Sequence, residues 1–147
     1  MALAKKKNIE SYKDTEISTA NQGKLIIMLY EGALRFLKIA NDNMSHKTYD
    51  VVNTNIIKAQ DIVTELMLSL NMETGGEIAQ NLFSIYAYLK KRLIEGNISK
   101  DPAILNEVVK HLEDLKTAWE EAAGKTASSA QTPTTNQQKG VSFSISG

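Results

Sequence analysis

The sequence predicts an all-α fold, an antiparallel up-down-up-down four-helix bundle. Apolar residues recur at spacings of three and four along four stretches of about 20 residues, which is the period of an amphipathic helix. Short polar segments separate the four stretches, and short connections make successive helices antiparallel neighbours. Of the two prolines, only Pro102 lies in a predicted helix, at its first position, so no helix is forced to kink.

The first predicted helix covers residues 21–43, with Asn21 as a candidate N-cap. Its apolar run, residues 25–30, is much shorter than the roughly 20 residues that span a bilayer, and Arg35 and Lys38 interrupt its continuation. We therefore expect no membrane insertion. The predicted core stripe of this helix is Leu25, Leu29, Ala33, Phe36 and Ala40.

The other three helices are predicted over residues 49–70, 77–95 and 102–123. Gly75 and Gly76 separate the second from the third, Gly96 is a candidate C-terminal stop, and Asp101 is a candidate N-cap before Pro102. The predicted core stripes are Val52, Ile56, Ala59, Val63, Leu66 and Leu70 on the second helix; Ile78, Leu82, Ile85, Leu89 and Leu93 on the third; and Leu105, Val108, Leu112, Leu115, Trp119 and Ala122 on the fourth.

Two polar segments flank the predicted bundle domain, residues 21–123. Residues 1–20 form an N-terminal arm, and residues 124–147 are rich in Ser, Thr, Gln, Asn and Gly, a composition typical of a disordered tail. Within the tail, Val141, Phe143 and Ile145 alternate with serines. This alternation fits either a strand that adds to a partner's edge or a plain disordered terminus.

Composition excludes several classes of function. The chain carries 17 basic and 17 acidic residues, so its net charge gives no reason to expect nucleic acid or an anionic membrane as partner. It has no cysteine, which rules out disulfides and cysteine–zinc sites. No apolar segment follows the basic cluster at residues 5–7, as it would in a signal peptide, so we expect a cytoplasmic protein.

No catalytic or metal-binding motif stands out. A di-iron bundle would need Glu-x-x-His, with the two residues three apart, whereas Glu107 and His111 are four apart and His46 lies in a predicted loop. We find no nucleophile motif and no phosphate-binding glycine loop. The sequence therefore predicts no enzyme, no metal and no cofactor. We interpret His111 as a residue at the edge of the core.

Three helices carry apolar residues outside, or beside, the stripe of about 100° that a bundle core requires. A wide core stripe or scattered surface residues would explain them, as would a homodimer interface. A contiguous surface for an amphipathic helix or an extended apolar segment of a partner is the alternative that we favour. The candidate binding residues are Ile27, Tyr30, Leu34, Ile57, Leu68, Phe83 and Tyr86, with Ile94 also off its stripe.

Several segments together resemble the FliS family of flagellin export chaperones. They are residues 19–33 (TANQGKLIIMLYEGA), 55–62 (NIIKAQDI), 75–82 (GGEIAQNL) and 86–88 (YAY), with the late Trp119. The resemblance implies a cytoplasmic helical bundle that binds the C-terminal segment of flagellin, which is disordered in the monomer. It also implies that the chaperone prevents premature polymerisation and assists delivery to the flagellar type III export gate.

Two further expectations come from the same resemblance. Ile9 and Tyr12 are similar to an N-terminal Ile-x-x-Tyr element that is implicated in docking to the export gate and can fold back on the bundle. A simple packing of these two residues on the core is the alternative. The tail is longer than is usual in the family, and its role is open.

Overall fold

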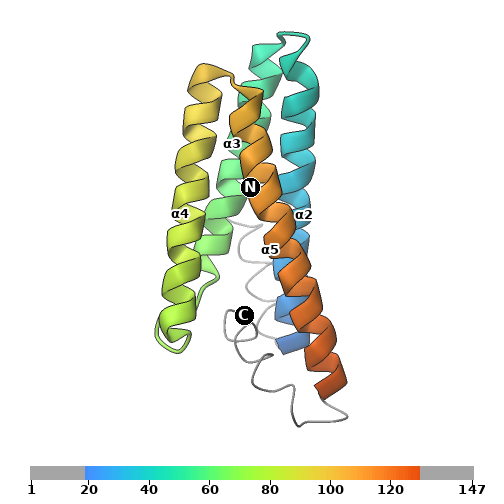
Figure 1. Ribbon diagram of the computed structural model, residues 1–147, viewed down its shortest axis with the longest axis vertical. Coiled ribbons are helices and arrows are strands. Elements are labelled where there is room, and N and C mark those ends of the chain that lie inside the picture. Colours follow the sequence, from blue (N-terminus) through green and yellow to red (C-terminus); the bar gives the residue numbers. More distant parts are fainter. Residues whose placement is uncertain (1–18, 130–147) are drawn as a thin grey trace, which may run out of the picture.

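The structure is a computed structural model that describes residues 19–129, and these form four helices. They are α2 (Thr19–Met44), α3 (Tyr49–Leu68), α4 (Gly76–Ser99) and α5 (Pro102–Ser129). The helices alternate in direction, each packs against the next, and α2 packs against α5 to close the ring (Figure 1). The predicted four-helix bundle is confirmed. Ile9, Tyr12 and the residues from 130 onward lie outside the described part of the chain.

Several helix ends differ from the prediction: α3 ends at Leu68, two residues early, and three other ends affect a predicted cap, stop or tail. α2 begins at Thr19, so Asn21 lies inside the first turn and is not its cap. α4 continues past Gly96 to Ser99, where Lys100 adopts the left-handed conformation (φ 53°) and donates its N–H to the Gly96 carbonyl. α5 extends to Ser129, so residues 124–129, which we predicted to belong to the disordered tail, are helical.

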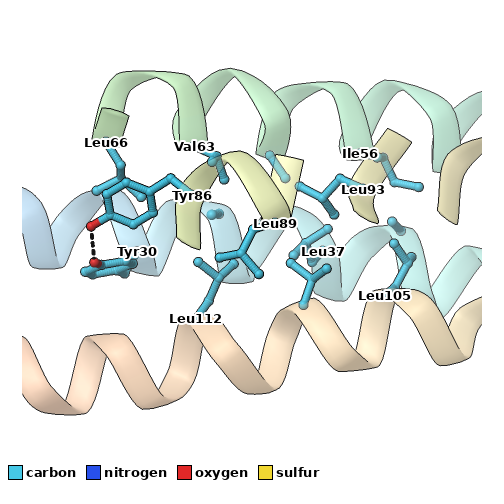
Figure 2. Packing of buried hydrophobic residues seen from close by; sticks show 14 of the residues in the cluster. Tyr30, Leu37, Ile56, Val63, Leu66, Tyr86, Leu89, Leu93, Leu105 and Leu112 are labelled. Carbon is cyan, nitrogen blue, oxygen red and sulfur yellow. Dashed lines mark hydrogen bonds between the residues drawn. The ribbon is translucent and has the colours of Figure 1, made fainter. Parts of the chain in front are cut away.

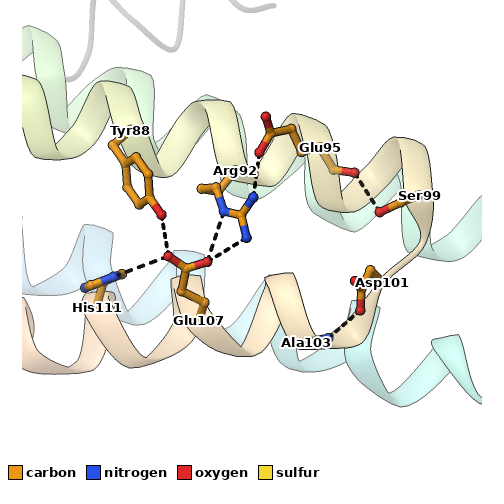
Figure 3. Close-up of polar contacts among 8 residues, drawn as sticks. All are labelled: Tyr88, Arg92, Glu95, Ser99, Asp101, Ala103, Glu107 and His111. Atoms are coloured by element: carbon orange, nitrogen blue, oxygen red, sulfur yellow. Dashed lines mark hydrogen bonds and ion pairs between the residues drawn. The ribbon is translucent and has the colours of Figure 1, made fainter.

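Gly96 serves the contact between α4 and α5 instead of ending a helix. It is buried, and a Cβ built on it would lie 3.1 Å from Cγ2 of Ile104 and 3.2 Å from Cδ2 of Leu105. Asp101 caps α5 as predicted: its Oδ1 accepts a hydrogen bond of 2.9 Å from the N–H of Ala103 (Figure 3).

The core of α2 is offset by one position from the predicted stripe. Ala33 and Ala40 are buried as expected, but Leu25, Leu29 and Phe36 are only half-buried. The buried stripe of α2 is Ile26, Tyr30, Ala33, Leu37, Ala40 and Met44. The stripe of α3 is confirmed, and that of α5 is confirmed except for half-buried Leu115. On α4, Leu82, Leu89 and Leu93 are buried as predicted, Ile78 is half-buried, and Tyr86 replaces Ile85 in the interior.

Two tyrosines meet inside the bundle, Tyr30 of α2 and Tyr86 of α4. Their hydroxyl groups hydrogen-bond to each other in the buried cluster (Figure 2), and their side chains are almost fully covered. Burial raises the pKa of Tyr30 far above its ordinary value, and the nearby Tyr86 adds to the effect. Burial also raises the pKa of Tyr86, to about 12. The fold therefore holds both phenols in the neutral form.

This pair predicts a non-additive response to removal of the hydroxyl groups. Tyr30→Phe leaves the buried Tyr86 hydroxyl with the ring N–H of Trp119 but without the hydroxyl of Tyr30, which should lower the free energy of unfolding by about 1–3 kcal/mol. The double variant Tyr30→Phe, Tyr86→Phe removes both groups and leaves the ring N–H of Trp119 without them, and its loss should be smaller than the sum of the two single losses. Urea denaturation of the four proteins of this cycle measures the coupling, and additive losses would contradict the account.

The same pair predicts a loss of stability at alkaline pH. Both pKa values are higher in the folded chain than the value of about 10 in an unfolded chain. Below pH 10 both states hold the protons; above it the unfolded state releases them first, so the free energy of unfolding falls as the pH rises. Urea denaturation across this range should show a smaller fall in the double phenylalanine variant. Identical falls in the two proteins would rule out this origin.

Candidate functional site

Exposed apolar side chains concentrate along the outer edge where α3 and α4 meet. Within residues 19–129, eleven large hydrophobic side chains are exposed. Six of the eleven belong to α3 and α4 on the sides that these helices turn towards each other: Tyr49, Ile57, Leu68, Phe83, Ile94 and Ile98. Large exposed apolar areas mark sites of interaction more often than single exposed residues do.

A hydrogen bond fixes the register of these two antiparallel helices. Nδ2 of Asn97 on α4 donates to Oδ1 of Asn53 on α3, at 2.7 Å. One turn further along from this contact, Ile57 lies at the level of Ile94. Three turns beyond that pair, Leu68 lies at the level of Phe83. Eleven residues at 1.5 Å per residue put the two apolar pairs about 16 Å apart along the bundle.

Small and charged side chains lie between the two pairs. Thr64 of α3 is at the level of exposed Ala87 of α4. The Thr64 hydroxyl donates to the carbonyl of Gln60 on its own helix, at 3.1 Å, so it needs no partner from outside. We call the six residues Ile57, Thr64, Leu68, Phe83, Ala87 and Ile94 the α3–α4 surface. It offers bulky apolar contacts at both ends, and in the middle Thr64 and Ala87 lie beside exposed Asp61 and half-buried Lys90, which are at one level.

The structure does not bring all seven predicted binding residues together. Ile57, Leu68 and Phe83 lie on the α3–α4 surface with exposed fractions of 43%, 72% and 41%. Ile27 and Leu34 are half-buried, seven residues apart on the side of α2 that faces α5. They lie on a different edge of the bundle.

Tyr30 and Tyr86 are core residues, which corrects their placement among the surface residues. Their exposed fractions are 0% and 1%, so neither side chain reaches a partner in this structure. The α2 stripe lies one position from the predicted one, and the mutual hydrogen bond lets both hydroxyl groups be buried. Conversely, we missed Tyr49 and Ile98. Their spacing could have revealed them, since each lies on the same helix side as Ile57 or Ile94.

The edge between α2 and α5 holds an open cleft of about 530 Å³. Leu34 and Val109 supply its apolar residues. Two contacts between the helices brace it: Nζ of Lys116 lies 3.8 Å from Oε2 of Glu31, and Asn41 donates to Asn106 at 3.1 Å. Hydrogen bonding to Glu120 raises the pKa of Lys116, and Glu31 adds to the effect.

A polar cluster joins α4 to α5 on another edge (Figure 3). Arg92 holds Oε1 of Glu107 through Nε at 3.0 Å and through its second terminal nitrogen at 2.9 Å, and the Tyr88 hydroxyl donates to Oε2 of Glu107. The hydrogen bond from Tyr88, followed by those from Arg92, lowers the pKa of Glu107. An ionised carboxylate with both oxygens engaged acts as a brace between helices and is poorly placed to accept a proton from a substrate.

Two further features of the described residues bear on function. Within residues 19–129, no group of three His, Cys, Asp or Glu side chains could hold a metal ion. Over the same range, none of the helices is sufficiently long and apolar to span a bilayer.

Comparison with known proteins gives a consistent family. Residues 5–126 match the family model described as flagellar protein FliS. The chain is 34% identical over 112 residues to the flagellar secretion chaperone FliS of Bacillus subtilis, covering 76% of this chain and 83% of that protein. It is 36% identical over 107 residues to the flagellar secretion chaperone FliSB of Pseudomonas aeruginosa, covering 73% and 85%. It is 30% identical over 118 residues to FliS of Vibrio cholerae, covering 78% and 87%. The chain therefore belongs to the FliS family of flagellar secretion chaperones.

Proposed function

We propose that this protein is a non-enzymatic, cytoplasmic export chaperone for flagellin. It binds the disordered C-terminal segment of flagellin, keeps the subunit from polymerising prematurely and assists its delivery to the flagellar type III export apparatus. Membership of the family of flagellar secretion chaperones supports the class of function. The observation that carries the binding mode is the α3–α4 surface, which remains exposed after the core is complete.

The spacing of the α3–α4 surface suits an amphipathic helix. The two apolar pairs are about 16 Å apart, the distance that eleven helical residues cover. A partner helix with apolar side chains at positions i, i+4, i+7 and i+11 would place its ends on the bulky pairs and its middle over Thr64 and Ala87. Each apolar side chain buried contributes about 1.5–3 kcal/mol, from which the cost of ordering the partner is subtracted.

The other predicted binding residues have different roles in this proposal. Ile27 and Leu34 are on the α2–α5 edge, where a long segment wrapping around the bundle would meet them after leaving the α3–α4 surface. Tyr30 and Tyr86 support the fold from inside. Ile9 and Tyr12, outside the described residues, are proposed to dock on a component of the export gate or to cover the binding surface.

A single charge placed on the α3–α4 surface is enough to test it, because the partner would bury that charge when it binds. Phe83→Asp or Ile57→Asp should weaken binding of the flagellin C-terminal segment roughly tenfold or more, since an apolar contact is lost and a carboxylate is desolvated. Ser84→Asp is the matched control, because Ser84 is also exposed on α4 and is turned about 100° from Phe83 around the helix axis. Calorimetric titration gives the affinities, and circular dichroism checks the helices. Equal affinities for Phe83→Asp and Ser84→Asp would contradict the proposed surface.

Burial of apolar surface also predicts the thermodynamic signature of the complex. Titrations with the flagellin C-terminal segment at several temperatures should give a negative heat-capacity change. No binding to the segment would reject the proposed client.

A homodimer formed through the same surface is the alternative function of these residues. Sedimentation distinguishes the two: a client should replace any self-association. A dimer that persists in excess flagellin segment would favour the homodimer.

A further inference from the structure

The C-terminal tail contains an apolar segment that belongs to no described helix. The family match ends at residue 126, and the described structure ends with α5 at Ser129. Residues 141–146 read Val-Ser-Phe-Ser-Ile-Ser, so an extended backbone would carry three apolar side chains on one face and serines on the other. We propose that residues 141–145 occupy the α3–α4 surface of their own chain when no partner is bound.

The tail leaves the bundle at the end from which it can reach the α3–α4 surface. α5 ends at the same end at which α3 passes into α4, as Figure 1 shows. Leu68 and Phe83 lie at that end, because Leu68 is the last residue of α3 and Phe83 is in the second turn of α4. Eleven residues lie between Ser129 and Val141, and an extended chain over the twelve steps that join the two reaches about 40 Å. Neighbouring helices are only about 8–10 Å apart, so the tail can pass around the end of the bundle to α3 and α4.

The spacing of the tail residues matches the surface. From Val141 to Ile145 an extended chain covers about 13 Å, close to the separation of about 16 Å between the two apolar pairs. With Val141 near Leu68 and Phe83, the aromatic ring of Phe143 falls over Thr64 and Ala87. Ile145 then approaches Ile57 and Ile94. The serine face is left towards water.

The tail brings no negatively charged side chain to this surface. Residues 130–147 contain Lys139 as their one charged side chain, and on the surface itself the carboxylate of Asp61 lies at the level of Lys90, a residue of opposite charge. Because the tail is tethered to the bundle, even a weak contact is favoured by a high effective concentration. The tail would then act as a placeholder that a client with more apolar contacts displaces. This last consequence rests on the proposed function, whereas the contact itself does not.

Paramagnetic relaxation in the full-length chain tests the contact without any client. The chain has no cysteine, so Ser144→Cys offers one site for a nitroxide label on the serine face. We expect the amide signals of Thr64 and Ala87 to lose most of their intensity, and those of Thr117, on the far side of α5, to be retained. Adding Phe143→Asp to the labelled chain should restore the signals of Thr64 and Ala87, and Phe83→Asp should restore that of Thr64.

Two results would overturn the proposal. Broadening confined to the end of α5 would show that the tail does not reach the α3–α4 surface. Broadening of Thr64 and Ala87 in a mixture of isotope-labelled chains without nitroxide and unlabelled chains with nitroxide would show that the tail binds a second copy instead. Since no flagellin is present, failure here leaves the proposed chaperone function standing, and failure of flagellin to bind leaves this contact standing.

Discussion

The interior of the bundle accepts one apolar stripe from each helix, and the rest of the structure depends on this limit. α2 contributes its stripe from Ile26 to Met44 and α3 its stripe from Val52 to Leu66. Once α4 and α5 complete the ring, the apolar side chains on its outer edges cannot be buried in the core. Burying them requires a segment from outside the four helices, so the candidate site follows from a fold that is already complete without it.

The Tyr30–Tyr86 pair shows how that interior tolerates polar atoms. A buried hydroxyl is costly unless it has a hydrogen-bonding partner, and here each tyrosine supplies the partner for the other across α2 and α4. The bundle edges are held differently. Asn53 with Asn97, Asn41 with Asn106 and the Arg92–Glu107 pair link neighbouring helices at the surface and fix their register. Register decides which apolar residues face each other, and thus the shape of the α3–α4 surface.

The sequence allowed the bundle to be predicted because its polar connections and its period of three to four are unambiguous. The side of α2 that is buried could not be predicted, since Leu25, Ile26 and Ile27 are all apolar and each could begin a core stripe. On α3, each core position has a polar residue on at least one side, and the predicted stripe was confirmed. In a sequence, a glycine can mark either the end of a helix or a close approach of a neighbouring helix. At Gly96, only the contact with Ile104 distinguishes the two.

The candidate site was harder to predict than the fold. Ile57, Leu68 and Phe83 are correctly placed outside the core, but their grouping depends on how far α3 and α4 slide along each other, which no single helix encodes. Tyr86 was misplaced because a phenol beside a core stripe can lie inside or outside, depending on whether it meets a partner hydroxyl. The family resemblance, by contrast, rests on the order of residues and needs no register.

The isoleucine methyl groups provide the most direct test of the α3–α4 surface as the partner site. The δ1 methyl signals of Ile57 and Ile94 should shift when the flagellin C-terminal segment is added, while that of Ile39, exposed on α2, should shift much less. Shifts confined to Ile39 and Ile27, with Ile57 and Ile94 unmoved at saturation, would contradict the account.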